Sequence, residues 1–179
     1  IFWGREAPEG ALYDLALKLG ADVPACLLGE ACLVSGVGEE VAPLAAFPDI
    51  PCVLANPGAP LSTPSVFKAF VAREFSFTPP LFLDPLNLGD VWELLARTKN
   101  DLQGPACGLL PEVGKVLMAL QRAKGAKFTR MSGSGATCFA LFESVADAEA
   151  AARGIAKANP AWWVKKTMLG RRSRFLAGA

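Results

Sequence analysis

Apolar residues recur at helical spacing near the start of the chain and again in its second half. The first set stands at positions i, i+3, i+4 and i+7 and comprises Leu12, Leu15, Ala16 and Leu19. This spacing places the four side chains on one face of an α-helix over residues 10–19. Gly20 follows where a glycine commonly ends a helix. The same reasoning predicts helices over 91–96 and 113–124.

Two further helices are predicted from their first residues. Thr63 is typical of an N-cap and Pro64 suits the first helical position. The apolar residues expected to face inward from this helix are Val66, Phe67, Phe70 and Val71. Ser144 is a second predicted N-cap, with an acidic residue three positions on, and its helix should run to about residue 158.

Short apolar runs predict the strands. They cover residues 31–35, 41–44, 52–55, 128–131, 136–142 and 163–168. The order of helices and strands predicts an α+β fold, with helices packed on one face of a largely antiparallel sheet. The prolines within 47–51 predict a boundary between a domain of residues 1–47 and one of residues 48–179.

Composition and charge exclude several classes of protein. Of 179 residues, 52% are hydrophobic, which is ample for a core, and the net charge of +1 argues against an extended nucleic-acid interface. No run reaches the ~20 apolar residues that span a bilayer, so we expect a soluble protein without membrane contact. The basic run at residues 171–174 is most simply a solvated terminus.

The chain contains no histidine, which excludes Ser-His-Asp and Cys-His catalysis within it. The five cysteines form no CxxC pair and predict reduced, buried thiols of a cytosolic protein. No cluster of carboxylates predicts a dedicated metal site.

The most informative segment is the glycine turn Ser132-Gly133-Ser134-Gly135. Glycine allows close backbone approach, and successive exposed N–H groups in such a turn form a concavity suited to anions. The apolar run 136–142 after it predicts a buried strand. A phosphate site and a plain tight hairpin are both compatible with this pattern.

Asp22 follows the first predicted helix, on a turn that Pro24 restricts from the other side. A carboxylate held there could accept a proton from a substrate hydroxyl. The alternative is that the Asp22 side chain only caps its own turn.

Five segments, taken in order, together resemble a known family. They are Leu19-Gly20-Ala21-Asp22-Val23-Pro24, Ser35-Gly36-Val37-Gly38-Glu39, Asn56-Pro57-Gly58 with Ser62-Thr63-Pro64, Asn100-Asp101-Leu102, and Met131-Ser132-Gly133-Ser134-Gly135-Ala136. The series resembles the carboxy-terminal part of the 4-diphosphocytidyl-2-C-methyl-D-erythritol kinases, which belong to the GHMP small-molecule kinases and act in the non-mevalonate isoprenoid pathway. The resemblance implies an α/β sandwich with a ferredoxin-like antiparallel sheet, preceded by the tail end of a ribosomal-S5-like, ATP-binding domain.

The resemblance also implies roles. Asp22 matches the catalytic aspartate that takes the proton of the substrate's 2-hydroxyl as it attacks the γ-phosphate of ATP. Thr63 and Phe67 match positions that hold the substrate's cytidine, the ring by stacking; capping by Thr63 and a core position for Phe67 are the alternatives. The motif that supports the ATP loop beside the phosphates matches Ser132, Gly133, Ser134, Gly135 and Ala136.

The implied cofactor is ATP with Mg²⁺ carried mainly by the nucleotide, and the implied location is the bacterial cytoplasm or the plastid stroma. Asn100 and Asp101 match a pair whose role we interpret as structural, and Gln103 stands where the family commonly has an acidic residue. The family's glycine-rich ATP loop and its amino-terminal lysine have no counterpart here, so we expect this chain alone to be inactive. Another GHMP kinase, or a non-enzymatic α+β binding module, are the alternative functions.

Overall fold

The computed structural model describes residues 10–44, 47–72, 78 and 90–170. These residues form two compact units, each described by itself below. The first unit contains 10–44, 47–48 and Gly170, and the second contains 49–72, 78 and 90–169.

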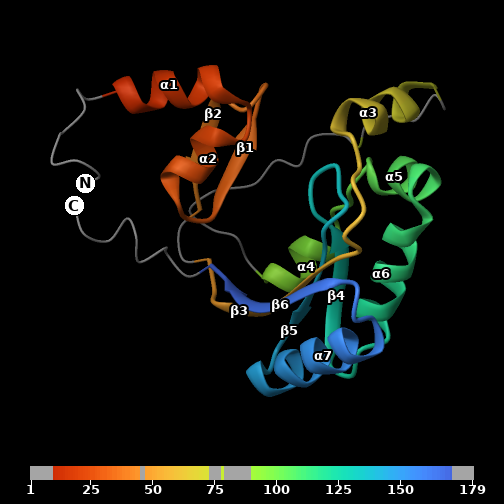
Figure 1. Ribbon diagram of the computed structural model, residues 1–179. Helices are drawn as coiled ribbons and strands as arrows, with labels where there is room; N and C mark the ends of the chain where they lie inside the picture. The colour runs from red at the N-terminus through yellow and green to blue at the C-terminus, as the bar shows by residue number, and fades with distance from the viewer. Residues whose placement is uncertain (1–9, 45–46, 73–77, 79–89, 171–179) are drawn as a thin grey trace, which may run out of the picture. The chain divides into compact units, whose positions relative to one another are not determined.

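The first unit consists of two short helices and a hairpin (Figure 1). Its helices are α1 (Ala11–Leu19) and α2 (Val23–Leu28), and its strands are β1 (Cys32–Ser35) and β2 (Glu40–Pro43). The two strands pair antiparallel, as the sequence predicts. Helix α2 was not predicted, although a proline in the first turn, here Pro24, is compatible with a helix start.

Helix α1 confirms the predicted periodicity but not the predicted burial. Ala16 is buried, whereas Leu12 and Leu15 are each 52% exposed and Leu19 is 69% exposed. Gly20 ends the helix as expected, and its backbone N–H donates to the carbonyl of Ala16. The apolar face of α1 is therefore largely uncovered by the described residues.

The second unit contains a four-stranded antiparallel sheet. Its strands are β3 (Ile50–Asn56), β4 (Ala126–Met131), β5 (Cys138–Phe142) and β6 (Trp163–Leu169), in the spatial order β4-β5-β3-β6. Helices separate β3 from β4 and β5 from β6, whereas a turn joins β4 to β5. This β-α-β-β-α-β arrangement is the ferredoxin-like sheet that the family resemblance implies.

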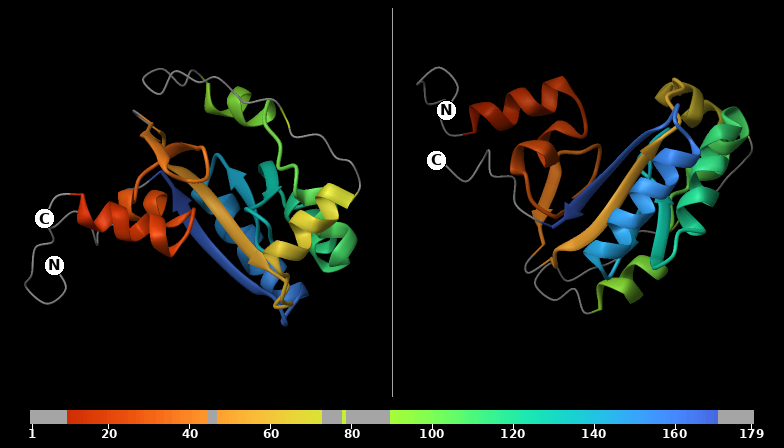
Figure 2. Two further views of the ribbon diagram at one scale, coloured as in Figure 1. Left: turned by 90° about the horizontal axis from the view of Figure 1, so that it is seen from above. Right: turned by 60° about the horizontal axis from the view of Figure 1, so that its bottom comes forward.

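Helices α6 (Pro111–Gln121) and α7 (Val145–Ala158) pack along the same face of this sheet (Figure 2). The remaining helices are α3 (Thr63–Ala72), α4 (Val91–Ala96) and α5 (Gln103–Leu109). Helix α5 was not predicted because Gly104, Pro105 and Gly108 give it a low helix propensity. The predicted cap of α7 is confirmed, since the Ser144 hydroxyl accepts hydrogen bonds from the N–H groups of Ala146 and Asp147.

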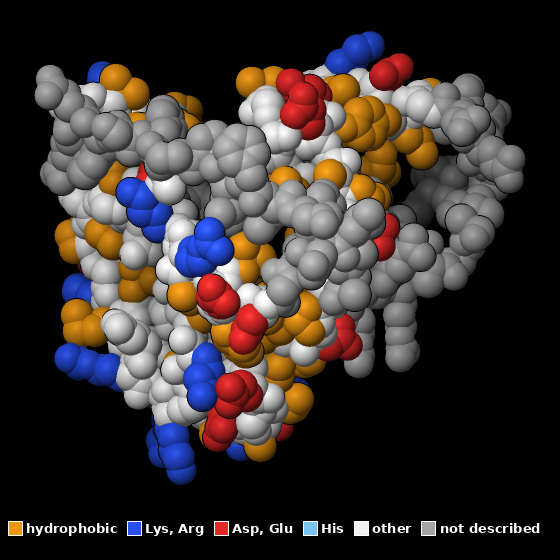
Figure 3. Space-filling view, turned by 180° about the vertical axis from the view of Figure 1, so that it is seen from behind, with side chains coloured by type: hydrophobic (Ala, Val, Ile, Leu, Met, Phe, Trp, Pro, Cys, Tyr) orange, Lys and Arg blue, Asp and Glu red, His pale blue; other side chains and the backbone are white. Residues whose placement is uncertain are grey.

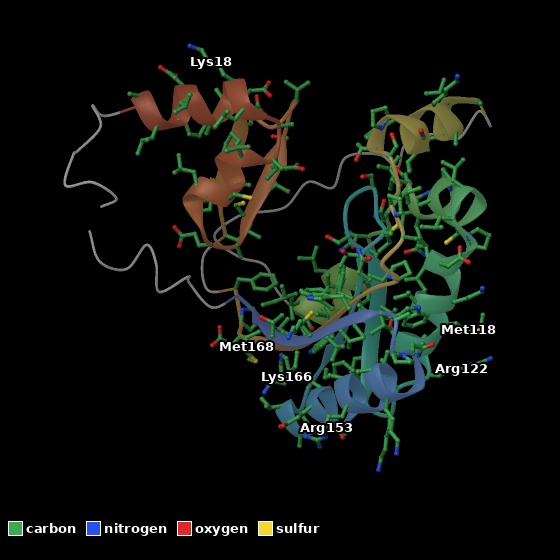
Figure 4. The ribbon with its side chains drawn as sticks, viewed as in Figure 1. Lys18, Met118, Arg122, Arg153, Lys166 and Met168 are labelled. Atoms are coloured by element: carbon green, nitrogen blue, oxygen red, sulfur yellow. The ribbon has the colours of Figure 1, made fainter. Side chains whose placement is uncertain are left out.

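One continuous core lies between the sheet and these two helices. Strand β5 is central and almost wholly buried, which confirms the prediction from its apolar run. Its inward side chains Cys138, Ala140 and Phe142 meet residues such as Leu120 of α6 and Ile155 of α7. On the outer side of α6, Met118 and Arg122 point away from the sheet (Figure 4), and Met118 is 49% exposed.

The cysteines are free, but not all are buried as predicted. Burial raises the pKa of the Cys52 and Cys138 thiols to about 12. Cys26 is exposed and Cys32 and Cys107 are only partly covered, so the prediction of five buried thiols is wrong. Cys26 lies on α2, whose faces the sequence did not define because the helix itself was not predicted.

The described residues include no helix long and apolar enough to cross a membrane. The face drawn in Figure 3 carries both Lys and Arg side chains and Asp and Glu side chains.

Candidate active site

The glycine turn joins β4 to β5 and is closed by its own backbone. The N–H of Ser132 donates to the carbonyl of Thr137 at 2.9 Å, and the N–H of Gly135 donates to the carbonyl of Ser132 at 3.0 Å. Gly133 has φ of +52° and Gly135 has φ of +92°, a region that L side chains rarely adopt. A Cβ on Gly135 would also lie 2.9 Å from the sulfur of the Met131 side chain, so the backbone conformation favours glycine and a larger residue would have to displace that side chain.

Two consecutive N–H groups of the turn are available to a ligand. Among the described residues, the backbone N–H groups of Gly133 and Ser134 have no protein acceptor. Gly133 is exposed and Ser134 is half-buried, so both groups lie at or near the surface. Adjacent N–H donors of this kind suit an anion such as a phosphate oxygen.

Two asparagines from other segments bond to the turn. Asn100 donates from Nδ2 to the carbonyls of Met131 at 2.9 Å and Gly133 at 2.7 Å. Asn56 donates from Nδ2 to the Thr137 hydroxyl at 2.9 Å. The turn is therefore held at both of its ends by side-chain amides.

The start of α3 bonds directly to the turn. The hydroxyl oxygens of Thr63 and Ser134 lie 2.7 Å apart, in a hydrogen bond that either can donate. The first hydrogen bond of α3 runs from the N–H of Val66 to the carbonyl of Ser62, so Ser62 rather than Thr63 is the N-cap residue. The structure thus brings together two residue groups, Thr63 and the glycine turn, that the sequence separates by about seventy positions.

Helix α3 exposes one of its two phenylalanines. Val66 is fully buried and Phe70 is 2% exposed, which confirms half of the predicted inward face. Phe67 is 44% exposed and Val71 is 70% exposed, so the prediction that they face inward is wrong. Phe67 lies one helical turn after Thr63, and its ring is exposed rather than part of the core.

Asp22 belongs to the first unit, where it immediately precedes α2. Its side chain is exposed and forms no capping hydrogen bond to α2, which disfavours the interpretation that it only caps its own turn. The described residues contain no group of three His, Cys, Asp or Glu side chains that could hold a metal ion.

The hairpin loop packs against the segment that carries Asp22. Gly38 has φ of +107°, and a Cβ built on it would lie 2.0 Å from the carbonyl oxygen of Ala21. Only glycine fits this contact without a backbone shift. The Tyr13 hydroxyl donates to the carbonyl of Glu39, which ties the same loop to α1. The Gly-Val-Gly-Glu segment therefore supports the turn next to Asp22.

The Asn100-Asp101 pair is structural in the way that the sequence suggests, and Asp101 anchors a residue beyond α3. Its carboxylate accepts hydrogen bonds of 2.7 Å from both the N–H and the hydroxyl of Thr78. The hydrogen bond from the Thr78 N–H, and then that from its hydroxyl, hold the pKa of Asp101 below its ordinary value. Burial opposes them, and the neighbouring Lys99 lowers the pKa by smaller amounts.

Sequence reasoning missed two polar contacts of the site. Asn56 was given only as part of a segment that resembles the family, with no contact predicted for it, although its Asn-Pro-Gly context is a signal for a side chain that bonds to its own turn. Gln103 was treated as a departure from the family, yet its Oε1 accepts the N–H of Met131 at 3.0 Å. A carboxylate oxygen would accept the same bond, so Gln103 preserves this function.

Comparisons with known proteins agree on one group of enzymes. Residues 87–161 match the family described as GHMP kinases C terminal. The chain is 42% identical over 168 residues to a 4-diphosphocytidyl-2-C-methyl-D-erythritol kinase of Chelativorans sp. (strain BNC1), covering 93% of this chain and 56% of that protein. It is 47% identical over 146 residues to the enzyme of that name in Paracoccus denitrificans (strain Pd 1222), covering 82% of this chain and 53% of that protein.

A solved structure gives the same result. The crystal structure of a 4-(cytidine 5'-diphospho)-2C-methyl-D-erythritol kinase matches with a TM-score of 0.70 and 35% identity, over 91% of this chain and 59% of that one. The chain thus spans little more than half the length of the relatives that it matches. Residues 87–161 are thus similar to the carboxy-terminal domain of GHMP kinases, and over the length compared the chain is similar to 4-diphosphocytidyl-2-C-methyl-D-erythritol kinases.

Proposed function

We propose that this chain forms part of an enzyme that transfers the γ-phosphate of ATP to the 2-hydroxyl of 4-diphosphocytidyl-2-C-methyl-D-erythritol. The single observation that carries the proposal is the identity of 42% over 168 residues to a kinase with this name. Two observations support it independently: the Gly133 and Ser134 N–H groups have no acceptor among the described residues, and the Ser134 hydroxyl is hydrogen-bonded to the Thr63 hydroxyl at the start of α3.

Each candidate residue has a role in the proposed reaction. Asp22 accepts the proton of the substrate hydroxyl on a carboxylate oxygen as that hydroxyl attacks the phosphorus. The turn Ser132–Ala136 donates N–H hydrogen bonds to phosphate oxygens and stabilises the charge that develops on them. Phe67 offers its exposed ring to the cytosine, and Thr63 holds the start of α3 in place beside the turn.

The proposal also covers the metal ion, the domain organisation and the cellular location. Mg²⁺ would arrive on the phosphates of ATP and supply charge neutralisation there. Residues 1–47 would belong to an ATP-binding domain and 48–179 to the carboxy-terminal domain, in the cytoplasm or the plastid stroma. We propose that the family's glycine-rich ATP loop and lysine must come from additional chain, so that this chain alone is inactive.

A chimaera tests the proposed role of Asp22. Residues 10–170 replace the matched half of the Chelativorans relative, and phosphorylation of 4-diphosphocytidyl-2-C-methyl-D-erythritol is followed with ATP. We expect turnover, and a loss of roughly a hundredfold or more in kcat for Asp22→Asn, because general-base catalysis contributes about 10²–10⁴-fold. The control is Asp14→Asn, on the exposed surface of α1, which should retain activity. Full activity of Asp22→Asn would exclude the role.

A non-enzymatic binding module is the second candidate, because the sequence contains no counterpart of the family's glycine-rich ATP loop. Calorimetric titration of this chain with ATP tests the module hypothesis. The module hypothesis predicts no change on adding ATP, whereas tight ATP binding by this chain would count against it.

A further inference from the structure

We propose that Asn100 is a positioning residue that sets the direction of the Ser134 N–H in the glycine turn. This inference rests on the proposed function, because it takes that N–H to be a phosphate donor. It goes beyond the structural role that the sequence suggests for the Asn-Asp pair, since it assigns Asn100 an effect on ligand affinity.

The Asn100 amide uses all of its principal hydrogen-bonding groups. Its Nδ2 donates to Met131 O at 2.9 Å and to Gly133 O at 2.7 Å, while its Oδ1 accepts the N–H of Leu102 at 3.0 Å. The amide cannot be reversed, because an oxygen at the Nδ2 position would face two carbonyl oxygens. The side chain is therefore fixed in one orientation.

Fixing a carbonyl also fixes the N–H of the same peptide. In a planar trans peptide the C=O and the following N–H point in opposite directions. When Asn100 holds the carbonyl of Gly133, the N–H of Ser134 is directed to the opposite side. That N–H has no acceptor among the described residues, as the site requires of a donor to an incoming anion.

The second bond orients the other end of the turn in the same way. With the carbonyl of Met131 held by Asn100, the N–H of Ser132 points to the carbonyl of Thr137 and closes the turn at 2.9 Å. Asn100 is itself anchored, because its carbonyl accepts the N–H of Gln103 and the Gln103 side chain accepts the N–H of Met131. The start of α5 and the turn thus form one hydrogen-bonded assembly.

The test is Asn100→Asp in the full chain, labelled with ¹⁵N. Aspartate keeps the shape and the acceptor for Leu102, but it replaces the two donors with oxygen that repels both carbonyls. We expect a displaced Ser134 amide resonance and faster exchange at the Gly135 amide. We also expect about tenfold weaker binding of inorganic tripolyphosphate, since a redirected Ser134 N–H loses its hydrogen bond to a charged oxygen.

The matched control is Asn159→Asp at the end of α7. Asn159 also donates from Nδ2 to a backbone carbonyl, that of Ile155 at 3.1 Å, but it contacts no residue of the turn in any hydrogen bond of the described chain. This variant should leave the Ser134 resonance and the tripolyphosphate affinity unchanged. A residue that acts only through stability would change neither quantity in the folded fraction.

Each outcome decides the inference. Wild-type Ser134 and Gly135 amide behaviour in Asn100→Asp would overturn it. If tripolyphosphate moves no turn resonance even in the wild-type chain, the proposed phosphate role fails, while the exchange data still test whether Asn100 orders the turn. If Asn100→Asp does not fold, Asn100→Ser replaces it, because a hydroxyl is too short to reach both carbonyls and should displace the same resonances.

Discussion

Leu120 and Leu15 both lie on the apolar side of a helix, but they differ in how far they are buried. Leu120 of α6 is fully buried between helix and sheet, whereas Leu15 of α1 is 52% exposed. The same contrast holds for the two units. In the second, a continuous core runs from β3 to α7, whereas among the described residues of the first only small or cyclic ones such as Ala16 and Pro24 are buried.

The difference teaches that periodicity identifies an apolar face but not what covers it. In the second unit the sheet supplies a second layer, so the helices gain the full hydrophobic stabilisation of burial. In the first unit the two-stranded hairpin is too small to supply that layer. The stability of the described chain should therefore reside mainly in the second unit.

The largest expected effect compares these two leucines directly. Leu120→Ala should reduce the free energy of unfolding by about 2–5 kcal/mol, because it removes buried methyl groups and leaves a cavity. Leu15→Ala should cost less than about 1 kcal/mol, since its side chain remains half in water. Urea unfolding followed by circular dichroism measures both. Equal losses would show that the first unit has a core of its own.

A glycine pair compares backbone requirements in the two units. Gly38→Ala forces a Cβ to within 2.0 Å of the Ala21 carbonyl oxygen at φ of +107°, whereas Gly114→Ala in α6 meets no atom within 4 Å. We expect Gly38→Ala to cost about 1–3 kcal/mol and Gly114→Ala to stabilise its helix by up to about 1 kcal/mol. In ¹⁵N spectra Gly38→Ala should also shift the amide resonance of Asp22. An unmoved Asp22 resonance would show that the hairpin loop does not support the turn beside Asp22.

The hydrogen bond between Thr63 and Ser134 tests whether α3 and the glycine turn stabilise each other within the second unit. In a double-mutant cycle of Thr63→Val and Ser134→Ala, we expect a coupling of about 0.5–1.5 kcal/mol in the free energy of unfolding, because the two hydroxyls share one hydrogen bond. Thr63→Val combined with Ser144→Ala should be additive, since the Ser144 hydroxyl bonds only to α7. Additivity in both cycles would mean that the bond contributes nothing measurable.

The smallest effect is expected from pH. The pKa of Asp101 is held below its ordinary value of 3.8, so its contribution to stability is present above that value and is lost as pH falls through the lower value of the folded state. The wild-type chain should therefore exceed Asp101→Asn in unfolding free energy at neutral pH. The difference should disappear in strong acid, and a difference that grew on acidification would contradict the assignment.

Much of the second unit could be predicted because its local signals agree with its packing. Ser144 caps its helix as predicted. The apolar run 136–142 contains β5, which is largely buried because it is a central strand of the sheet. Phe67 and Phe70 of α3 show what local sequence does not predict. Which of the two is buried depends on the segments that pack against α3, and these are distant in the sequence. In the same way, the periodicity of α1 predicted its apolar face but not that this face would be largely exposed.

The candidate site also has parts that could be predicted from the sequence and parts that could not. The glycine turn and Asp22 could be identified from local sequence, because glycine and carboxylate chemistry are local properties. The bonds from Asn100, Asn56 and Gln103 to the turn could not, because they depend on tertiary contacts across the sheet. The sequence predicts candidate site residues, and the fold shows which other residues are hydrogen-bonded to the glycine turn.

The central claim is tested most directly by a substrate panel. The chimaera that carries residues 10–170 would be supplied with ATP and, in turn, 4-diphosphocytidyl-2-C-methyl-D-erythritol, mevalonate or homoserine, and phosphate transfer would be measured. We predict transfer to the cytidyl substrate alone. Transfer only to mevalonate or homoserine, or none from a folded chimaera that binds ATP, would contradict the account.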